Sequence, residues 1–288
     1  MARTHIVIMA GGIGKRLAPL STPEKPKQFL DLLETGKTLI QMTYERCKEI
    51  DPNAVFWVVT SEQYFDLVRE QVPEIYPWHI LLEPESKNTA PCIAYASWRI
   101  YMEDPDALVM VVPADAYIES TEMFVKSIQT ALPQVEDGIV CVGIKPTGPS
   151  TEYGYIEVAQ KPRNNDFLVP VASFTEKPDA ETATKYLISK TFWWNAGIFI
   201  WKVQTVLDEL RTYVPDIYGA FWDIHTLFTS IWEKEAVKEV YKEIPKISID
   251  YAVMEKSNKI KMLAVDWNWS DLGSFEAIEK VTGHKIAR

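Results

Sequence analysis

The 288-residue chain lacks several features that particular protein classes need. Its 3 cysteines, Cys47, Cys92 and Cys141, are an odd number and form no Cys-x-x-Cys pair. This pattern argues against a disulfide framework and a zinc-thiolate site, and it fits a reducing cytoplasm. Apolar runs such as LVMVV at 108–112 fall far below the roughly 20 residues of a membrane span. Because no signal peptide opens the sequence either, we expect a soluble cytoplasmic protein with no membrane partner.

Dense positive charge is missing as well. The chain has 30 Lys and Arg against 40 Asp and Glu, a formal net charge of -10, and it has no long basic run. Nucleic acid is therefore not expected as a main partner, because affinity for its phosphate backbone depends on dense Lys and Arg. With 47% hydrophobic residues, the chain can bury a large core, as one large α/β domain or as one domain with an appendage.

The order of apolar patterns predicts an α/β fold with a mostly parallel sheet flanked by helices. Predicted strands cover 5–9, 55–60, 79–82, 107–112 and 139–143, and predicted helices cover about 39–50, 62–72, 90–103 and 121–134. After residue 145 we expect a hairpin and further strands with a helix at about 179–189, then helices from 203 to 243. Ligands of such sheets bind beyond the carboxyl ends of the strands, so the loops there are the place to look for chemistry.

A glycine-rich loop follows the first predicted strand, in the segment MAGGIGKRLAPLSTPEKPKQFL at 9–30. Glycines let backbone N–H groups approach a ligand closely, and nearby cations add full positive charge. The loop and its surroundings supply three of each: Gly11, Gly12, Gly14, Lys15, Arg16 and Lys27. A turn that only joins a strand to a helix would not explain the three cations, so we predict a polyphosphate site.

The spacing does not match two better-known glycine loops. A Walker loop would need glycine at Met9 and a hydroxyl residue at Arg16. A dinucleotide fingerprint would need a third glycine at Leu17 and an acidic residue closing a second strand about 20 residues later. The first mismatch argues against a Walker loop, and the second disfavours a Rossmann dehydrogenase.

Two aspartates are candidate ligands for Mg²⁺. Asp115 comes just after the predicted strand at 107–112, and Asp271 comes just before a predicted C-terminal helix. Taken singly, each is explained as a turn former or helix cap. If both face a loop that holds polyphosphate, they form the site that Mg²⁺ prefers, with one or two protein oxygens and the rest from phosphate and water.

Three other polar motifs keep two interpretations each. Asn88 and Thr89 could read the edge of a base, although their place at a helix start explains them equally well. Glu176 and Lys177 could bind sugar hydroxyls and a second phosphate, although an exposed ion pair is the simpler account of that pair alone. The aromatic residues beside Asn195 are more typical of a core than of a stacking platform.

Nine motifs stand in one order, and the set extends from about residue 5 to 276: AGGIGKRLAPLS, PKQFL, EPESKNTAPCIAYA, VVPADAYI, TEYGYIE, FTEKP, WWNAGIFIW, SIDYAVMEK and WSDLGS. In this the sequence resembles the sugar nucleotidyltransferases, most closely the mannose-1-phosphate guanylyltransferases. The resemblance implies one domain over 1–288 of the nucleotide-diphospho-sugar transferase type, Rossmann-like with an inserted antiparallel sugar-binding portion. Its nucleotide-binding half would be 1–145, its sugar-phosphate-binding half 146–276, and its C-terminal tail 277–288.

The resemblance also implies a reaction and a set of site residues. GTP and α-D-mannose 1-phosphate would give GDP-mannose and pyrophosphate with Mg²⁺ as cofactor. Catalytic cations would be Arg16, Lys27 and Lys177, and Mg²⁺ ligands would be Asp115 and Asp271. Nucleotide contacts would come from Gly11, Gly12, Gly14, Lys15, Glu83, Pro84, Asn88 and Thr89. Sugar contacts would come from Tyr153, Gly154, Glu176 and Asn195.

Some positions depart from the pattern of that family, and some alternatives stay open. Ala18 stands where these enzymes commonly carry Trp, Lys87 where Arg usually precedes Asn-Thr, and Ala116 where His is frequent. The first two put details of the loop and base contacts in doubt. The same fold could use another base or hexose, or could serve as a non-catalytic regulatory homologue. The aromatic content of 192–232 leaves room for a homodimer face.

Overall fold

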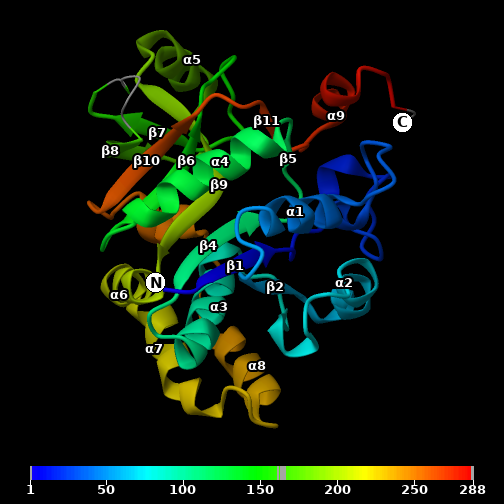
Figure 1. The fold of residues 1–288 in the computed structure, drawn as a ribbon, viewed down its shortest axis with the longest axis vertical. Coiled ribbons are helices and arrows are strands. Elements are labelled where there is room, and N and C mark those ends of the chain that lie inside the picture. Colours follow the sequence, from blue (N-terminus) through cyan, green and yellow to red (C-terminus); the bar gives the residue numbers. More distant parts are fainter. Residues whose placement is uncertain (1, 161, 163–166, 287–288) are drawn as a thin grey trace.

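The computed structural model describes residues 2–160, 162 and 167–286 (Figure 1). Within them, nine strands form one sheet in the order β3-β2-β1-β4-β9-β6-β10-β8-β7, and β5 and β11 form a separate two-stranded ribbon. The strands are β1 (Thr4–Met9), β2 (Val55–Ser61), β3 (Ile80–Glu83), β4 (Leu108–Pro113), β5 (Tyr117–Ile118), β6 (Ile139–Ile144), β7 (Tyr155–Val158), β8 (Leu168–Thr175), β9 (Phe192–Lys202), β10 (Ile260–Val265) and β11 (Trp269–Ser270). The α-helices are α1 (Leu39–Lys48), α2 (Phe65–Gln71), α3 (Thr89–Glu103), α4 (Thr121–Ala131), α5 (Ala180–Ser189), α6 (Val203–Tyr213), α7 (Pro215–Ile224), α8 (Glu233–Glu243) and α9 (Phe275–Thr282).

The two halves of the sheet differ in strand direction. In the first half, β1 pairs in parallel with β2 and β4, and β2 pairs in parallel with β3. In the second half, β10 pairs in parallel with β6, whereas β9 runs antiparallel to β4, β6 and β7, and β8 runs antiparallel to β7 and β10. The sheet is therefore mixed: its first half is parallel, as expected, and its second half combines the parallel β6–β10 pair with antiparallel ones. Of the antiparallel pairs, β7–β8 joins consecutive strands and the others join strands separated in the sequence, whereas the helical crossovers of the first half produce parallel pairs.

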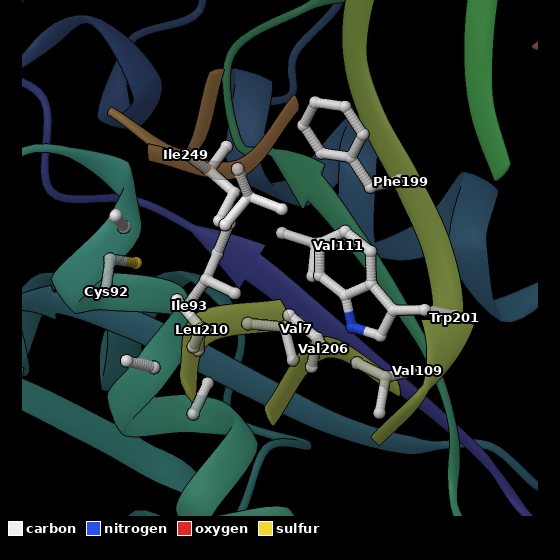
Figure 2. Packing of buried hydrophobic residues seen from close by; sticks show 14 of the residues in the cluster. Val7, Cys92, Ile93, Val109, Val111, Phe199, Trp201, Val206, Leu210 and Ile249 are labelled. Atoms are coloured by element: carbon white, nitrogen blue, oxygen red, sulfur yellow. The ribbon is translucent and has the colours of Figure 1, made fainter. Parts of the chain in front are cut away.

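Two hydrophobic cores cover the two faces of the sheet. Alternate residues of β1 point to opposite faces, since Val7 packs in one core and Ile6 and Ile8 pack in the other. The core around Val7 includes residues of α3, α6, α7 and α8, and Figure 2 shows β-strand valines, α3, α6 and Trp201 of β9 meeting there. The other core includes residues of α1, α2, α4 and α5. Burial on both faces explains the continuous apolar runs of the central strands.

The predicted elements agree with the structure in type, and the differences concern their ends. The five predicted strands correspond to β1, β2, β3, β4 and β6, within one or two residues at each end. The predicted helical stretch 203–243 is divided into α6, α7 and α8. Pro215 stands at the first position of α7, where its missing N–H and fixed φ are tolerated, so it ends one helix and begins the next. Among the helices in the described ranges, none combines the length and the apolar composition that crossing a membrane requires.

Candidate active site

The glycine loop after β1 is held by hydrogen bonds from Gln28, in the turn that also carries Lys27. The Gln28 amide nitrogen donates to the carbonyl oxygens of Ala10 at 2.7 Å and of Gly12 at 2.9 Å. Gly14 has a left-handed φ of +67°, and a Cβ added there would lie 2.7 Å from the Cβ of Lys27. A residue with a side chain would be strained and would also collide, so this position requires glycine.

Lys27 links the loop to the two aspartates. Its residue is only 4% exposed, and its ammonium donates to the Asp115 carboxylate at 2.8 Å and to the backbone carbonyl of Asp271. Asp115 follows β4, which pairs with β1 in parallel, so the glycine loop and Asp115 lie at the same edge of the sheet. The structure therefore brings Lys27, Asp115 and Asp271 together.

Asp271 collects a second set of contacts. Its carboxylate accepts hydrogen bonds from the Tyr153 hydroxyl at 3.1 Å and from the Gly273 N–H at 3.0 Å, and an Arg16 nitrogen lies 3.4 Å away. Arg16 is also ion-paired with Glu152. Burial, and then the negative charge of Asp271, raise the pKa of the Tyr153 hydroxyl, so it remains a donor. Arg16, Tyr153 and Asp271 thus form one polar cluster.

A small hydrophobic core keeps Arg16 close to Asp271. Leu17 and Leu272, the next residues along the chain, are both fully buried and belong to one cluster with Leu39 and Ile278 of α1 and α9. Burial of both leucines in one cluster holds the segments that carry Arg16 and Asp271 near each other. The loops of the two aspartates are tied in a similar way, because Ser270 pairs with Tyr117 in the β5–β11 ribbon.

Gly154, Glu176 and Asn195 form a second cluster. Gly154 comes just before β7, Glu176 just after β8, and Asn195 lies within β9. The Asn195 N–H donates to the Gly154 carbonyl at 2.8 Å. A Cβ added to Gly154 would collide with the Glu176 carboxylate, whose side chain is 8% exposed. Glycine therefore makes room for a nearly buried carboxylate beside a carboxamide, a pair that can both accept from and donate to hydroxyl groups.

Lys177 and Asp250 complete the second cluster. Lys177 has a left-handed φ of +48° and is ion-paired with Glu176. Burial lowers its pKa, but the pair with Glu176 and the charge of Asp250 outweigh burial and raise it overall. Asp250 accepts from the Asn195 carboxamide at 3.0 Å. Burial, and then repulsion from Glu176, raise the pKa of Asp250 to about 7.

Glu83 lies beneath the glycine loop. It is 5% exposed, accepts from the Tyr241 hydroxyl at 2.9 Å, and leaves no room for a Cβ on Gly11, which would lie 2.9 Å from its other oxygen. Burial raises the pKa of Glu83 to about 7, although the Tyr241 hydrogen bond opposes the shift. Its neighbour Pro84 is exposed, as are Gly12 and Lys15 on the loop above.

Asn88 and Thr89 make structural contacts at the start of α3. The Asn88 side-chain oxygen accepts from the Thr89 N–H at 2.8 Å, and Asn88 has a left-handed φ of +72°. The Thr89 hydroxyl accepts from the Ile249 N–H at 2.8 Å. These bonds satisfy the cap, and they leave the Asn88 NH₂ group as the donor that could face a ligand.

Three polar residues of these clusters carried no role in the sequence analysis. Gln28, Glu152 and Asp250 each stand in a motif that carries the family resemblance, PKQFL, TEYGYIE and SIDYAVMEK. Asp250 begins a π-helix, Asp250–Met254, a form that is often found at functional sites. A polar residue inside such a motif was the available signal, but its neighbours in space could not be inferred from the sequence.

The two aspartates suit a hard cation that brings other ligands with it. In the described part of the chain, no three His, Cys, Asp or Glu side chains gather closely enough to hold a metal by themselves. Asp115 and the carbonyl of Asp271 already share one cation, the ammonium of Lys27. Positive charge therefore fits between the Asp115 carboxylate and this carbonyl, whereas the Asp271 carboxylate contacts Arg16, Tyr153 and the Gly273 N–H. One or two protein carboxylates plus phosphate oxygens and water are what Mg²⁺ prefers.

Comparisons with known proteins identify the family of the chain. A model of the nucleotidyl transferase family matches residues 5–286. Mannose-1-phosphate guanylyltransferase 2 of Escherichia coli O157:H7 is 38% identical over 94% of this chain and 58% of its own length, so the chain spans about three fifths of this relative. A crystal structure from Thermus thermophilus, described as a mannose-1-phosphate geranyltransferase, superposes with a TM-score of 0.86 at 31% identity over 98% of this chain and 80% of that one.

A more distant structure, a UDP-glucose pyrophosphorylase complexed with UDP-glucose, shares the fold with a TM-score of 0.60 at 17% identity, covering 98% of both chains. The mixed sheet with its covering helices is thus the nucleotide-diphospho-sugar transferase fold. Since the family model spans nearly the whole sequence, the chain belongs to the nucleotidyl transferase family.

Proposed function

We propose that the protein is a mannose-1-phosphate guanylyltransferase, which makes GDP-mannose and pyrophosphate from GTP and α-D-mannose 1-phosphate. The observation that carries the proposal is the meeting of Asp115 and Asp271 around the Lys27 ammonium, at the edge of the sheet where the glycine loop lies. The names of the relatives support the choice of guanine and mannose.

In this proposal residues 1–145, the Rossmann-like half, hold the nucleotide. Gly11, Gly12 and Gly14 offer backbone N–H groups to the phosphates, and Lys15, Arg16 and Lys27 compensate their charge. The Glu83–Pro84 turn, Asn88 and Thr89 lie next to the base. Asp115 and Asp271 hold Mg²⁺, which when bound neutralises charge on the phosphates.

The antiparallel portion within residues 146–276 holds the sugar phosphate. Glu176 and Asn195, beside Gly154, bind hydroxyl groups, Tyr153 lies between the two clusters, and Lys177 binds the phosphate. A sugar phosphate has its second pKa near about 6, so it is largely a dianion at neutral pH and needs no general base. Its oxygen attacks the α-phosphorus in line, and pyrophosphate leaves. The chain's own residues therefore align the reactants and offset their charge.

The proposal is tested by incubating the chain with Mg²⁺, mannose 1-phosphate and each of the four nucleoside triphosphates. We expect pyrophosphate release with GTP, GDP-mannose as the product, and loss of both in Asp271→Asn. Turnover with another base or another hexose phosphate would show that the substrates differ from those proposed while the type of reaction is the same. Nucleotide binding without turnover would instead indicate a non-catalytic regulatory homologue.

A homodimer and a cytoplasmic setting belong to the same proposal. Trp222 and Ile231, inside the aromatic-rich stretch 192–232, are 48% and 87% exposed. Light scattering across a concentration series measures whether this face joins two copies, and Trp222→Glu with Ile231→Glu should shift the mass toward the monomer if it does.

A further inference from the structure

A cavity of about 660 Å³ lies behind the β5–β11 ribbon. This volume falls within the range of about 300–1,000 Å³ found for small-molecule sites. Its walls come from the ribbon, the loop after β6, the segment between β10 and β11, and α9. Of all the site residues proposed above, only Tyr153 lines it. The cavity is therefore a separate space that shares one wall with the proposed active site.

Aromatic rings form much of this wall. Tyr153 packs edge-on against Trp194 at 5.0 Å and against Trp269 at 5.1 Å between ring centroids, and Trp267 also lines the cavity. Within the described residues, the indole nitrogens of Trp194, Trp267 and Trp269 are buried and have no hydrogen-bond partner. Because these nitrogens are buried, the three rings present apolar surface rather than hydrogen-bond donors to the cavity.

The charged residues of the cavity define the chemistry of a ligand that would bind there. Lys145 and Lys280 line it, both are exposed, and neither ammonium has a hydrogen bond or an ion pair to any residue that the structure describes. Two carboxylates, Glu119 and Asp266, line it as well. Ammonium groups suit a phosphate, carboxylates accept from hydroxyl groups, and aromatic rings pack against the apolar face of a sugar.

The cavity also touches the elements that position the proposed metal ligands. Ser270 and Tyr117, which pair across the ribbon, both line it and each stands one or two residues from Asp271 or Asp115. On its other side, the Tyr153 ring donates its hydroxyl hydrogen bond to Asp271 at 3.1 Å. A ligand that moves this ring or the ribbon would therefore move the carboxylates.

We propose that this cavity is a second binding site for a phosphorylated sugar, either free or as part of a sugar nucleotide, and that its occupation is coupled to the site of Asp115 and Asp271. Lys145 and Lys280 bind the phosphate, and the rings of Tyr153, Trp194 and Trp269 contact the sugar. Binding stands on the cavity alone, whereas the coupling rests on the function proposed above.

Calorimetric titration tests the binding. The probe for the free form is mannose 6-phosphate, which has no anomeric phosphate and cannot be a reactant, and the probe for the nucleotide form is GDP-mannose. We expect one molecule of mannose 6-phosphate, or two of GDP-mannose, to bind per chain. In Lys145→Glu/Lys280→Glu the second-site affinity should fall at least tenfold, and in Lys238→Glu, an exposed lysine of α8, it should stay within twofold. Equal affinity in the double variant, or no second-site binding of either probe, would overturn the proposal.

Manganese binding tests the coupling. The affinity of the unaltered chain for Mn²⁺, measured by electron paramagnetic resonance, should change at least threefold when mannose 6-phosphate is added, and the double variant should show no change. An unchanged Mn²⁺ affinity in the unaltered chain would overturn the coupling. Both lysines lie outside the proposed active site, so the double variant should form GDP-mannose at the normal rate. Absence of GDP-mannose from the unaltered chain would instead contradict the proposed function, and the two failures are thereby distinguished.

Discussion

Two lysines, Lys27 and Lys177, serve the two ends of the proposed site in different ways. The Lys27 side chain is 5% exposed and donates to groups that follow β4 and β11. The Lys177 side chain is 56% exposed, stands on a left-handed residue and pairs with its own neighbour, Glu176. The first lysine is built into the framework of the sheet, whereas the second is held by local contacts. We infer that the phosphate end is preformed and that the sugar end adapts to its ligand.

The largest effect should follow from damage to the phosphate end. Arg16→Ala removes a cation that contacts Asp271 and is ion-paired with Glu152 at this end, and loss of one well-placed electrostatic donor costs about 10²- to 10³-fold in rate. We expect kcat for GDP-mannose formation to fall by at least that order, with an unchanged circular dichroism spectrum. Lys25→Ala, an exposed cation of the same segment, is the control and should leave kcat within twofold. An unchanged kcat in Arg16→Ala would remove this residue from the mechanism.

The next effect compares the buried acids of the two ends by pH. Burial raises the pKa of Glu83 from an ordinary 4.5 to about 7, so between these values the folded chain holds a proton that the unfolded chain releases. Its contribution to the free energy of unfolding is therefore full below about pH 4.5 and is lost as pH rises through about 7, by about 3 kcal/mol. Asp250, at the sugar end, has the same direction and ends at about 7.

Urea unfolding at pH 5 and pH 8 measures this loss. We expect Glu83→Gln to lose less stability than the unaltered chain over this interval, and Asp250→Asn to do the same. The control is Glu85→Gln, an exposed neighbour whose loss should match that of the unaltered chain. Equal losses in all four proteins would show that neither buried acid holds a proton.

Damage to the sugar end should change binding more than turnover. In Lys177→Ala we expect the KM for mannose 1-phosphate to rise about tenfold, which corresponds to about 1.4 kcal/mol, while the KM for GTP stays within twofold. Lys190→Ala is a matched control, because Lys190 is also exposed and left-handed, with a φ of +60°. A larger fall in kcat than rise in KM would contradict the distinction between a preformed and an adaptable end.

An effect of similar size, on stability rather than binding, tests the close packing around Gly14 at the phosphate end. Gly14 and Gly36 both have left-handed φ values, +67° and +81°, but a Cβ would meet the Lys27 Cβ at Gly14 and nothing within 4 Å at Gly36. Both Ala variants carry the cost of the backbone conformation, so Gly14→Ala should be less stable than Gly36→Ala by a further 1–2 kcal/mol or so. Chemical denaturation of the two variants measures the difference. Equal stabilities would mean that the Lys27 side chain moves away from the added Cβ at no cost in free energy.

The elements of the fold could be predicted because their patterns are local. The strand at 55–60 and the helix at 90–103 correspond closely to β2 and α3, since burial and helix periodicity are written in neighbouring residues. The position of β9 between β4 and β6 could not be predicted, because pairing depends on contacts between distant segments. The same limit hid the β5–β11 ribbon, whose strands have two residues each and carry no periodicity.

The candidate site was predictable in its residues and less so in its contacts. Asp115 and Asp271 could be selected because each follows or precedes a recognisable element, and the place of Asp115 at the edge of the glycine loop followed from parallel pairing of β4 with β1. The contact of Lys27 with both segments, and the role of Asp250 beside Asn195, depend on side-chain geometry. No spacing in the sequence expresses such contacts.

The position of β9 also limits how this protein can move. This strand shares backbone hydrogen bonds with β6 on one side and with β4 and β7 on the other, so it is paired with strands of both halves of the sheet. A hinge between those halves would have to break a buried ladder, which is costly because its N–H and C=O groups would lose their partners. Ligands must therefore enter and leave through motions of the loops at the edge of the sheet, while the sheet itself stays rigid.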